Sequence, residues 1–325
     1  MTGVVVVWSG ERPRYEAIPI DGTLIIGRER LDPDDIEISR AHVQLTNRGM
    51  HLDVTDLGGR NGTLVNGQPV RRQTIAVTSP AIIRIGRTIC IAVADIAPYQ
   101  DLTLTRRGTI AIGGTLAESC RRVDTVALVE EHLALLGTLA VGGALAQGYA
   151  DRIGGDRLEA HLDPMTTLTL ERSIDGIDTA CSPRTLIVVL HRPITEADRV
   201  ELEQWLETDI RLVTVARCSD SYKYLSKELR ARLMPHVVEI PALRYDELPA
   251  TVVDVVAQRA PGMRIHASLI EAVLLQLGNG EERVMRWLPE AVDELVDREL
   301  PLIRGSDFED YLAREAARRN CVVGV

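Results

Sequence analysis

Turn-forming residues divide the first third of the chain into short β-branched runs, and this pattern constrains the fold more than any other feature. The runs are Val4–Val7, Thr23–Ile26, His51–Val54, Ile82–Ile85 and Ile89–Val93. The turns carry Asp21-Gly22, Asn47-Arg48-Gly49, Gly58-Gly59, Asn61-Gly62 and Asn66-Gly67. Several short strands joined by Gly- and Asn-rich turns are typical of an all-β sandwich. We therefore predict such a sandwich over residues 1–97.

The pattern becomes helical after an ambiguous linker at residues 98–114. Apolar residues over Leu116–Leu136 are three and four apart, which predicts a helix, and Leu139–Ile153 continues the pattern after Gly137. Thr195 and Asp198 form a capping-box pattern at the start of another helix. Apolar runs then alternate with helices, which predicts a parallel sheet covered on both faces. These expected strands are Leu186–Leu190, Ile210–Val215 and Val237–Ile240, with a helix over Tyr222–Leu233. After Tyr245 we expect helices at about 246–259, 266–277, 281–298 and 306–319.

Charge and cysteine usage exclude several classes of protein. The formal net charge is −10, from 47 acidic and 37 basic side chains, so neither DNA nor an anionic membrane is expected as the main partner. No apolar run approaches the length of about 18 residues that a membrane span needs. The five cysteines form no Cys-x-x-Cys pair, which argues against zinc and against a disulfide framework. We interpret the chain as a reduced cytoplasmic protein.

Four motifs in the β segment point to a phosphate-binding site. They are Gly27-Arg28, Ser39-Arg40-Ala41-His42, Arg60-Asn61-Gly62-Thr63 and Asn66-Gly67. In this order and spacing they resemble the forkhead-associated (FHA) domain, a phosphothreonine-binding module, from Thr23 to about Val93. The resemblance implies a partner protein phosphorylated on threonine, such as a Ser/Thr kinase or its substrate. The chemistry agrees, because a phosphate group needs a fixed cation and several hydrogen-bond donors held on loops.

The resemblance also implies a role for each residue. Arg28 and Ser39 match the positions that bind the phosphate, and Asn61 matches the asparagine that holds the peptide backbone. Arg40 and Arg60 match loop positions that line the phosphate, although either side chain could point to solvent. Residues that support the site are His42, beneath the Ser39 loop, and Gly27, Gly62, Thr63, Asn66 and Gly67.

One further position concerns the sequence preference of the site. Glu37 lies two residues before Ser39, and in the family this position often faces the third residue after the phosphothreonine. An acidic side chain there would favour Arg or Lys in the peptide. The alternative is that Glu37 points to solvent and apolar contacts determine the preference.

The remainder of the chain carries a second, weaker resemblance. Leu229-Arg230-Ala231-Arg232-Leu233 precedes a strand that ends Ile240-Pro241-Ala242-Leu243-Arg244. Over about residues 112–298 the chain resembles a diverged AAA+ domain of the bacterial enhancer-binding activators, which work with an alternative sigma factor. The implied fold is multidomain. It has an FHA sandwich at 1–97, a linker at 98–114, an α/β AAA+-like domain at 115–245, and a helical lid with a C-terminal helix at 246–325.

The catalytic motifs of that family do not appear in the chain. A phosphate-binding loop needs Gly-Lys-Ser/Thr, but the two lysines, Lys223 and Lys227, follow Tyr222 and Ser226. The stretch aligned with this loop places Leu145 at the lysine position. The strand Leu186–Leu190 should end in acids, and instead has Val189 and Leu190 at those positions. We therefore expect no catalytic residues, no nucleotide site, no cofactor and no metal.

Two functions follow from these observations. The first is a non-enzymatic signalling protein, in which the FHA domain binds a phosphorylated partner and the AAA+-like domain acts as a scaffold. The alternative is an ATP-dependent transcription activator with an FHA sensor. Self-association, or association with an active AAA+ relative, is compatible with the first.

Overall fold

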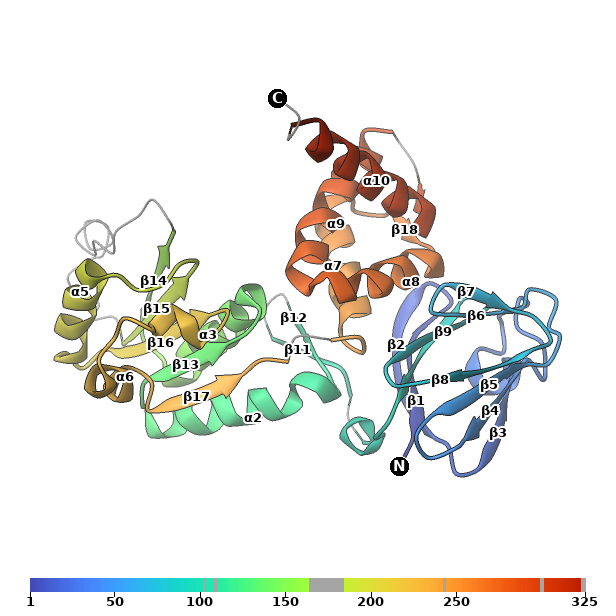
Figure 1. The fold of residues 1–325 in the computed structure, drawn as a ribbon, viewed down its shortest axis with the longest axis horizontal. Helices are drawn as coiled ribbons and strands as arrows, with labels where there is room; N and C mark the ends of the chain where they lie inside the picture. The colour runs from blue at the N-terminus through green and yellow to red at the C-terminus, as the bar shows by residue number, and fades with distance from the viewer. Residues whose placement is uncertain (102, 108–109, 164–183, 242–243, 299–300, 323–325) are drawn as a thin grey trace. The chain divides into compact units, whose positions relative to one another are not determined.

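The computed structural model describes residues 1–101, 103–107, 110–163, 184–241, 244–298 and 301–322 (Figure 1). The chain divides into two compact units. Unit 1 contains Met1–Thr105, Gly113–Thr115 and Leu243–Val325, and unit 2 contains Arg106–Ile112 and Leu116–Ala242. Each unit has its own hydrophobic cores. In the described residues, no helix is both long enough and apolar enough to cross a membrane.

The first part of unit 1 is a sandwich of two antiparallel sheets. The six-stranded sheet has the order β2-β1-β10-β9-β6-β7, and the four-stranded sheet has the order β3-β4-β5-β8. The strands are β1 (Gly3–Ser9), β2 (Arg12–Pro19), β3 (Thr23–Ile26), β4 (Val43–Asn47), β5 (Leu52–Asp56), β6 (Thr63–Val65), β7 (Gln68–Val70), β8 (Thr74–Val77), β9 (Ala81–Ile85) and β10 (Thr88–Val93). A short helix, α1 (Arg28–Leu31), follows β3. The predicted sandwich is confirmed, and each predicted run forms a strand.

Helices and a small sheet form the rest of unit 1. The helices are α7 (Leu248–Arg259), α8 (Ala267–Leu275), α9 (Glu281–Val296) and α10 (Gly305–Val322). Two short parallel strands, β18 (Arg264–Ile265) and β19 (Leu302–Ile303), join the segments before α8 and α10. The four helices predicted after Tyr245 are present, close to the predicted bounds.

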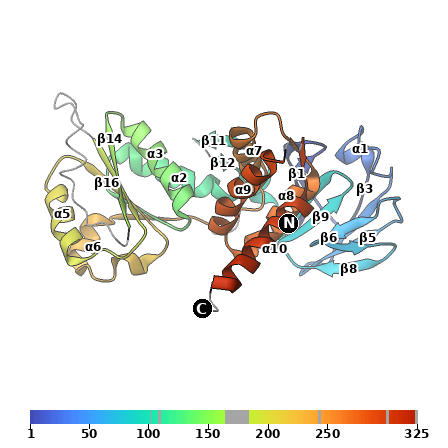
Figure 2. The same cartoon turned by 90° about the horizontal axis from the view of Figure 1, so that it is seen from above.

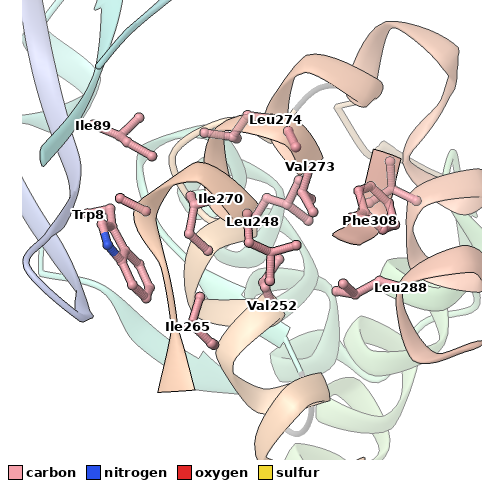
Figure 3. Packing of buried hydrophobic residues seen from close by; sticks show 14 of the residues in the cluster. Trp8, Ile89, Leu248, Val252, Ile265, Ile270, Val273, Leu274, Leu288 and Phe308 are labelled. Carbon is pink, nitrogen blue, oxygen red and sulfur yellow. The ribbon is translucent and has the colours of Figure 1, made fainter. Parts of the chain in front are cut away.

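These helices pack on the outer face of the six-stranded sheet. Trp8 and Ile89 from the sheet share one hydrophobic core with Leu248, Ile270 and Leu274 from the helices (Figure 3). Helix α8 contacts β1, β9 and β10, and Figure 2 shows it alongside β9. Each fully buried aliphatic side chain contributes about 1.5–3 kcal/mol. The helices predicted as a lid therefore belong, by their packing, to the same unit as the sandwich.

Unit 2 is built on a parallel sheet of order β14-β15-β16-β13-β17. Its strands are β13 (Leu133–Leu136), β14 (Arg157–Leu162), β15 (Thr185–Leu190), β16 (Arg211–Ala216) and β17 (His236–Glu239). Its helices include α2 (Gly114–Val129), which begins in unit 1, α3 (Leu139–Ile153), α5 (Glu196–Leu206) and α6 (Lys227–Leu233). A two-stranded sheet of β11 (Thr105–Arg107) and β12 (Ile110–Ile112) precedes α2.

Helices cover both faces of this sheet, as predicted. On β15, Ile187 packs in a core with side chains of α2 and α3, whereas Val188 packs in another core with side chains of α5 and α6. The predicted capping box at the start of α5 is confirmed, because Thr195 and Asp198 each accept a hydrogen bond from the other's main-chain N–H.

Two local predictions in unit 2 were wrong. The helix predicted over Leu116–Leu136 ends at Val129, and Leu133–Leu136 forms the strand β13 between β16 and β17. Four consecutive apolar residues fit a buried strand as well as a helix, so the pattern alone did not distinguish them. The helix predicted over Tyr222–Leu233 begins at Lys227, where the Ser226 hydroxyl accepts the Leu229 N–H, and a 3-10 turn covers Ser219–Tyr222.

Candidate functional site

Arg28 lies at the start of α1, directly after β3. Its main-chain N–H donates to the Ser39 carbonyl (3.0 Å), and its Nε donates to the Ile38 carbonyl (2.8 Å). These bonds fix the guanidinium beside Ser39, and both side chains are half-buried. Only glycine fits at position 27, because the Cβ atom of any other residue would lie 1.8 Å from the Arg40 carbonyl oxygen.

A buried imidazole joins this loop to the next one. His42 is 0% exposed. Its Nδ1 accepts a hydrogen bond from the Ser39 N–H (3.1 Å), and its Nε2 lies 3.0 Å from the Gly62 carbonyl oxygen. Since Nδ1 accepts, the neutral ring carries its proton on Nε2 and donates it to Gly62. A Cβ atom at Gly59 would lie 2.8 Å from this ring, so glycine is needed there as well.

Asn61 and Glu37 meet at the same end of the sandwich. Asn61 is exposed, and its Nδ2 donates to the Glu37 carbonyl (3.0 Å). The Glu37 N–H donates to Oδ1 of the buried Asp35 (2.9 Å), whose Oδ2 accepts the Arg87 N–H (2.9 Å). The acidic loop is therefore folded around Asp35, and its main chain reaches the Asn61 side chain.

A buried carboxylate, Asp56, supports the loops from beneath. Thr63 is buried, and its hydroxyl donates to Oδ2 of Asp56 (2.8 Å). Burial raises the pKa of Asp56, but hydrogen bonds from Arg72 N–H, the Thr63 hydroxyl and Gly58 N–H outweigh this and hold the pKa below its ordinary value. Asp56 therefore stays ionised and anchors the start of the loop that carries Asn61.

The turns around the site use left-handed backbone conformations. Gly62 has φ +70°, and Asn66 and Gly67 have φ values of +48° and +77° in the hairpin between β6 and β7. The Asn66 side chain also accepts the Ile82 N–H (2.9 Å), which ties the hairpin to β9. Glycine and asparagine are the residues that adopt such values at least cost.

Several further arginines belong to this end of the sandwich. Arg40 and Arg60 are exposed, and within the described ranges their guanidinium groups make no hydrogen bond or ion pair. Arg71 was not predicted. Its side chain lies over Gly62, where a Cβ atom would be 3.3 Å from the Arg71 Cγ. The sequence signal for it is the Arg71-Arg72 pair that follows β7.

The structure thus brings together Arg28, Ser39 and Asn61, with Glu37 beside Asn61. A guanidinium, a hydroxyl and a primary amide on adjacent loops are hydrogen-bond donors of the kind that a phosphate group accepts from. Two buried side chains, His42 and Asp56, hold the loops from within, and the exposed Asn61 amide joins them at the surface, so these residues are held in place.

Comparison with known proteins identifies this sandwich. Residues 24–86 match the family model described as the FHA domain, so the chain contains an FHA domain. No curated protein matches the chain.

Three solved structures are similar to parts of the chain. One, entitled "Structural and functional analysis of phosphothreonine-dependent FHA domain interactions", is 28% identical and covers 28% of this chain and 94% of that chain, with a TM-score of 0.24. The FhaA FHA domain complexed with the intracellular domain of Rv3910 is 25% identical and covers 29% of this chain and all of that chain (TM-score 0.25). The RuvB Holliday junction branch migration motor of Thermotoga maritima is 15% identical and covers 65% of this chain and 69% of that chain, with a TM-score of 0.45.

In unit 2, the junction between β13 and α3 corrects the predicted alignment. Gly137 has φ +145° and follows β13 directly, and α3 begins at Leu139. Counting the pattern Gly-x-x-x-x-Gly-Lys-Ser/Thr from Gly137 places Gly143 at the lysine position and Ala144 at the hydroxyl position. The lysine position therefore falls at Gly143 rather than at Leu145, which is buried in α3.

Basic side chains, rather than acidic ones, follow the end of β15. Val189 and Leu190 pack in the cores on opposite faces of the sheet, and His191-Arg192 follow. Arg192 forms two hydrogen bonds to the Asp198 carboxylate (2.6 and 3.1 Å), which fixes it to the start of α5. Among the residues that the structure describes, no group of three or more His, Cys, Asp or Glu side chains is suited to a metal ion.

Proposed function

We propose that this protein is a phosphothreonine-dependent signalling protein whose FHA domain binds a partner phosphorylated by a Ser/Thr kinase. Arg28 and Ser39 bind the phosphate, Asn61 holds the peptide backbone, and Arg40, Arg60 and Arg71 add positive charge around it. The family match supports the proposal. So do the similar FHA structures, one of which concerns phosphothreonine-dependent interactions and another a complex with an intracellular protein domain.

The observation that carries the proposal is the double hydrogen bond of His42. Its ring connects the loop of Ser39 to the loop of Gly62. Because Arg28 is bonded to the first loop and Asn61 lies next to Gly62, one buried side chain fixes the three donors relative to one another. A site held in this way loses little conformational entropy when it binds.

Calorimetry with a phosphothreonine peptide library, its unphosphorylated counterpart and two variants tests this proposal. We expect binding of the phosphorylated form alone. Arg28→Ala should weaken it by roughly tenfold to a hundredfold, since a hydrogen bond to a charged group contributes about 1.5–3 kcal/mol. Arg48→Ala is the control, because Arg48 is exposed in the hairpin between β4 and β5 and pairs with Asp53. Unchanged binding by folded Arg28→Ala would refute the site.

For unit 2 we propose a scaffold of the AAA+ type that does not hydrolyse ATP. Gly143 and Ala144 supply neither the ammonium nor the hydroxyl of a phosphate-binding loop, and Leu190 supplies no carboxylate at the end of β15. The scaffold could hold a second copy of the chain or an active AAA+ relative.

Titration with ATP and Mg²⁺ separates this scaffold from the ATP-dependent activator. We expect neither binding in the micromolar range nor hydrolysis above background. Arg230→Ala serves as the matched variant, because Arg230 belongs to the Leu229–Leu233 motif of the AAA+ resemblance and donates to the Tyr222 carbonyl (2.7 Å). Turnover above about 0.1 per second, below the usual enzyme range, that vanished in Arg230→Ala would contradict the scaffold.

A further inference from the structure

Unit 1 contains a pocket that the phosphopeptide function does not use. It has a volume of about 370 Å³, within the range of small-molecule sites, and it lies where β1 and β10 face the segment Tyr245-Asp246. Its walls are largely apolar, with Val5, Ile91 and Val93 from the sheet and the rings of Tyr99 and Tyr245. None of the residues placed at the phosphate-binding loops is among its described lining residues.

A buried carboxylate, Asp246, lies at one wall of this pocket. It is 3% exposed. Its Oδ1 accepts the Thr115 hydroxyl (2.5 Å) and its Oδ2 accepts the Thr115 N–H (3.3 Å). In the described part of the chain Asp246 forms no ion pair, so its described hydrogen-bond donors are neutral.

The neighbouring charges make this carboxylate costly to bury. Arg244 directs its Nε to Glu247 (2.8 Å) and its Nη1 to Glu281 (2.9 Å), and these three side chains are all buried. In the ion pairs of the described residues, the Arg244 guanidinium accompanies the carboxyl groups of Glu247 and Glu281, and Asp246 lies next to Glu247 in sequence. Burial raises the pKa of Asp246, and burial together with the charge of Asp246 raises the pKa of Glu247 to about 7. A positive charge at Asp246 would relieve this surplus.

We propose that this pocket binds a small organic cation, an amine whose ammonium group pairs with Asp246 and whose apolar part fills the space between the sheet and the tyrosine rings. The apolar walls favour a compact hydrocarbon body. Tyr99 and Tyr245 line the same pocket, and a cation that met the face of either ring would be attracted to it. An anion would meet the Asp246 carboxylate without compensation.

The test uses the full chain and three probes of nearly equal shape, which are benzylammonium, benzyl alcohol and benzoate. We expect benzylammonium to bind with a Kd of about 1 mM, benzyl alcohol to bind at least about tenfold more weakly, and benzoate not to bind. Calorimetry or ligand-observed NMR measures all three. The readout does not involve a phosphopeptide, so its outcome is independent of the FHA site.

Three variants test whether the probes bind in this pocket. Asp246→Asn keeps an oxygen for Thr115 but removes the charge, so it should weaken benzylammonium at least about tenfold and leave benzyl alcohol unchanged. Asp95→Asn is the matched control, because Asp95 also lines the pocket but is exposed, and it should change affinity less than about twofold. Ala94→Leu, at the exposed rim, should block both probes without disturbing the core.

The proposal is overturned if benzylammonium and benzyl alcohol bind alike, if Asp95→Asn costs as much as Asp246→Asn, or if folded wild type binds no benzylammonium. Should Asp246→Asn fail to fold, Ala94→Leu and the comparison of the three probes on wild type still decide the matter.

Discussion

The side-chain amide of Asn61 donates a hydrogen bond to the main-chain carbonyl of Glu37, at 3.0 Å. The sequence assigned these residues separate tasks, one holding the peptide backbone and the other selecting a side chain. Their contact joins the two loops at the edge of the candidate site. A bound peptide that used the Asn61 amide would have Glu37 as an immediate neighbour.

The charge of Glu37 should therefore influence the peptide preference. We predict that wild type favours Arg or Lys at the third position after the phosphothreonine and that Glu37→Lys reverses the preference. The Glu37 side chain is half-buried at a solvent-facing edge, so the effect should be about 0.2–1 kcal/mol. A peptide array that varies this position measures it.

The control for this prediction is Asp34→Lys, which reverses an exposed charge in the same loop. The preference should survive that change and should weaken with added salt, because the Debye length at physiological ionic strength is about 8 Å. If wild type shows no basic preference, or if Asp34→Lys abolishes it equally, Glu37 is not the selector.

Removing the buried imidazole should damage both stability and binding. His42→Ala leaves the Ser39 N–H and the Gly62 carbonyl without a partner, and each such loss costs about 1–3 kcal/mol. Phosphopeptide affinity should fall although His42 does not line the surface, since the loops lose their common anchor. Chemical denaturation and calorimetry measure the two effects.

His51→Ala provides the comparison, because His51 lies on the same sandwich and pairs with Asp53 at its exposed edge. It should change stability by less than about 0.5 kcal/mol and leave binding intact. Normal affinity in His42→Ala would mean that the loops keep their arrangement without the ring.

The sequence predicted the sandwich and most of the site because their signals are local. Gly27, Gly62 and Asn66-Gly67 report backbone conformations that neighbouring residues impose. Arg71 follows β7, and the pairing of β7 with β6 brings its side chain next to Gly62. The spacing of residues in the sequence does not predict this contact. Similarly, Leu133–Leu136 became a strand because β16 and β17 flank it.

One signal for the grouping of the helices with the sandwich lies in the sequence of β1. Val4–Val7 is apolar without alternation, which is typical of a strand buried on both faces. The segment that covers its outer face lies far along the chain in α7 and α8, so the sequence could not identify it. Arg84 of β9 even forms an ion pair with Glu271 of α8 (2.6 Å).

This packing predicts that the helices and the sandwich unfold together. Ile270→Ala removes a fully buried side chain from α8 and should cost about 2–5 kcal/mol. Hydrogen exchange should then accelerate in β1 and β10 as well as in α8. Val213→Ala, in the core of unit 2, should accelerate exchange in β13 and β16 instead. Faster exchange confined to the helices would show that the sandwich does not depend on them.

The buried carboxyl groups predict a dependence of stability on pH. The pKa of Glu247 is about 7 in the folded chain, against 4.5 ordinarily, because burial and the nearby Asp246 disfavour its charge. Between these two values the unfolded chain releases a proton that the folded chain keeps. Its contribution to stability is therefore complete below about pH 4.5 and is lost as the pH rises through about 7, at up to about 1.4 kcal/mol per unit.

Glu247→Gln isolates this contribution, because glutamine still offers an oxygen to the Gly113 N–H that Glu247 accepts at 2.7 Å. The free energy of unfolding of wild type, minus that of Glu247→Gln, should fall as the pH rises from about 4.5 to about 7. Glu11→Gln is the control, since Arg264 lowers the pKa of Glu11 and the corresponding difference should stay flat over this interval. A flat difference for Glu247→Gln, measured by denaturation at several pH values, would show that Glu247 is ionised in the folded chain.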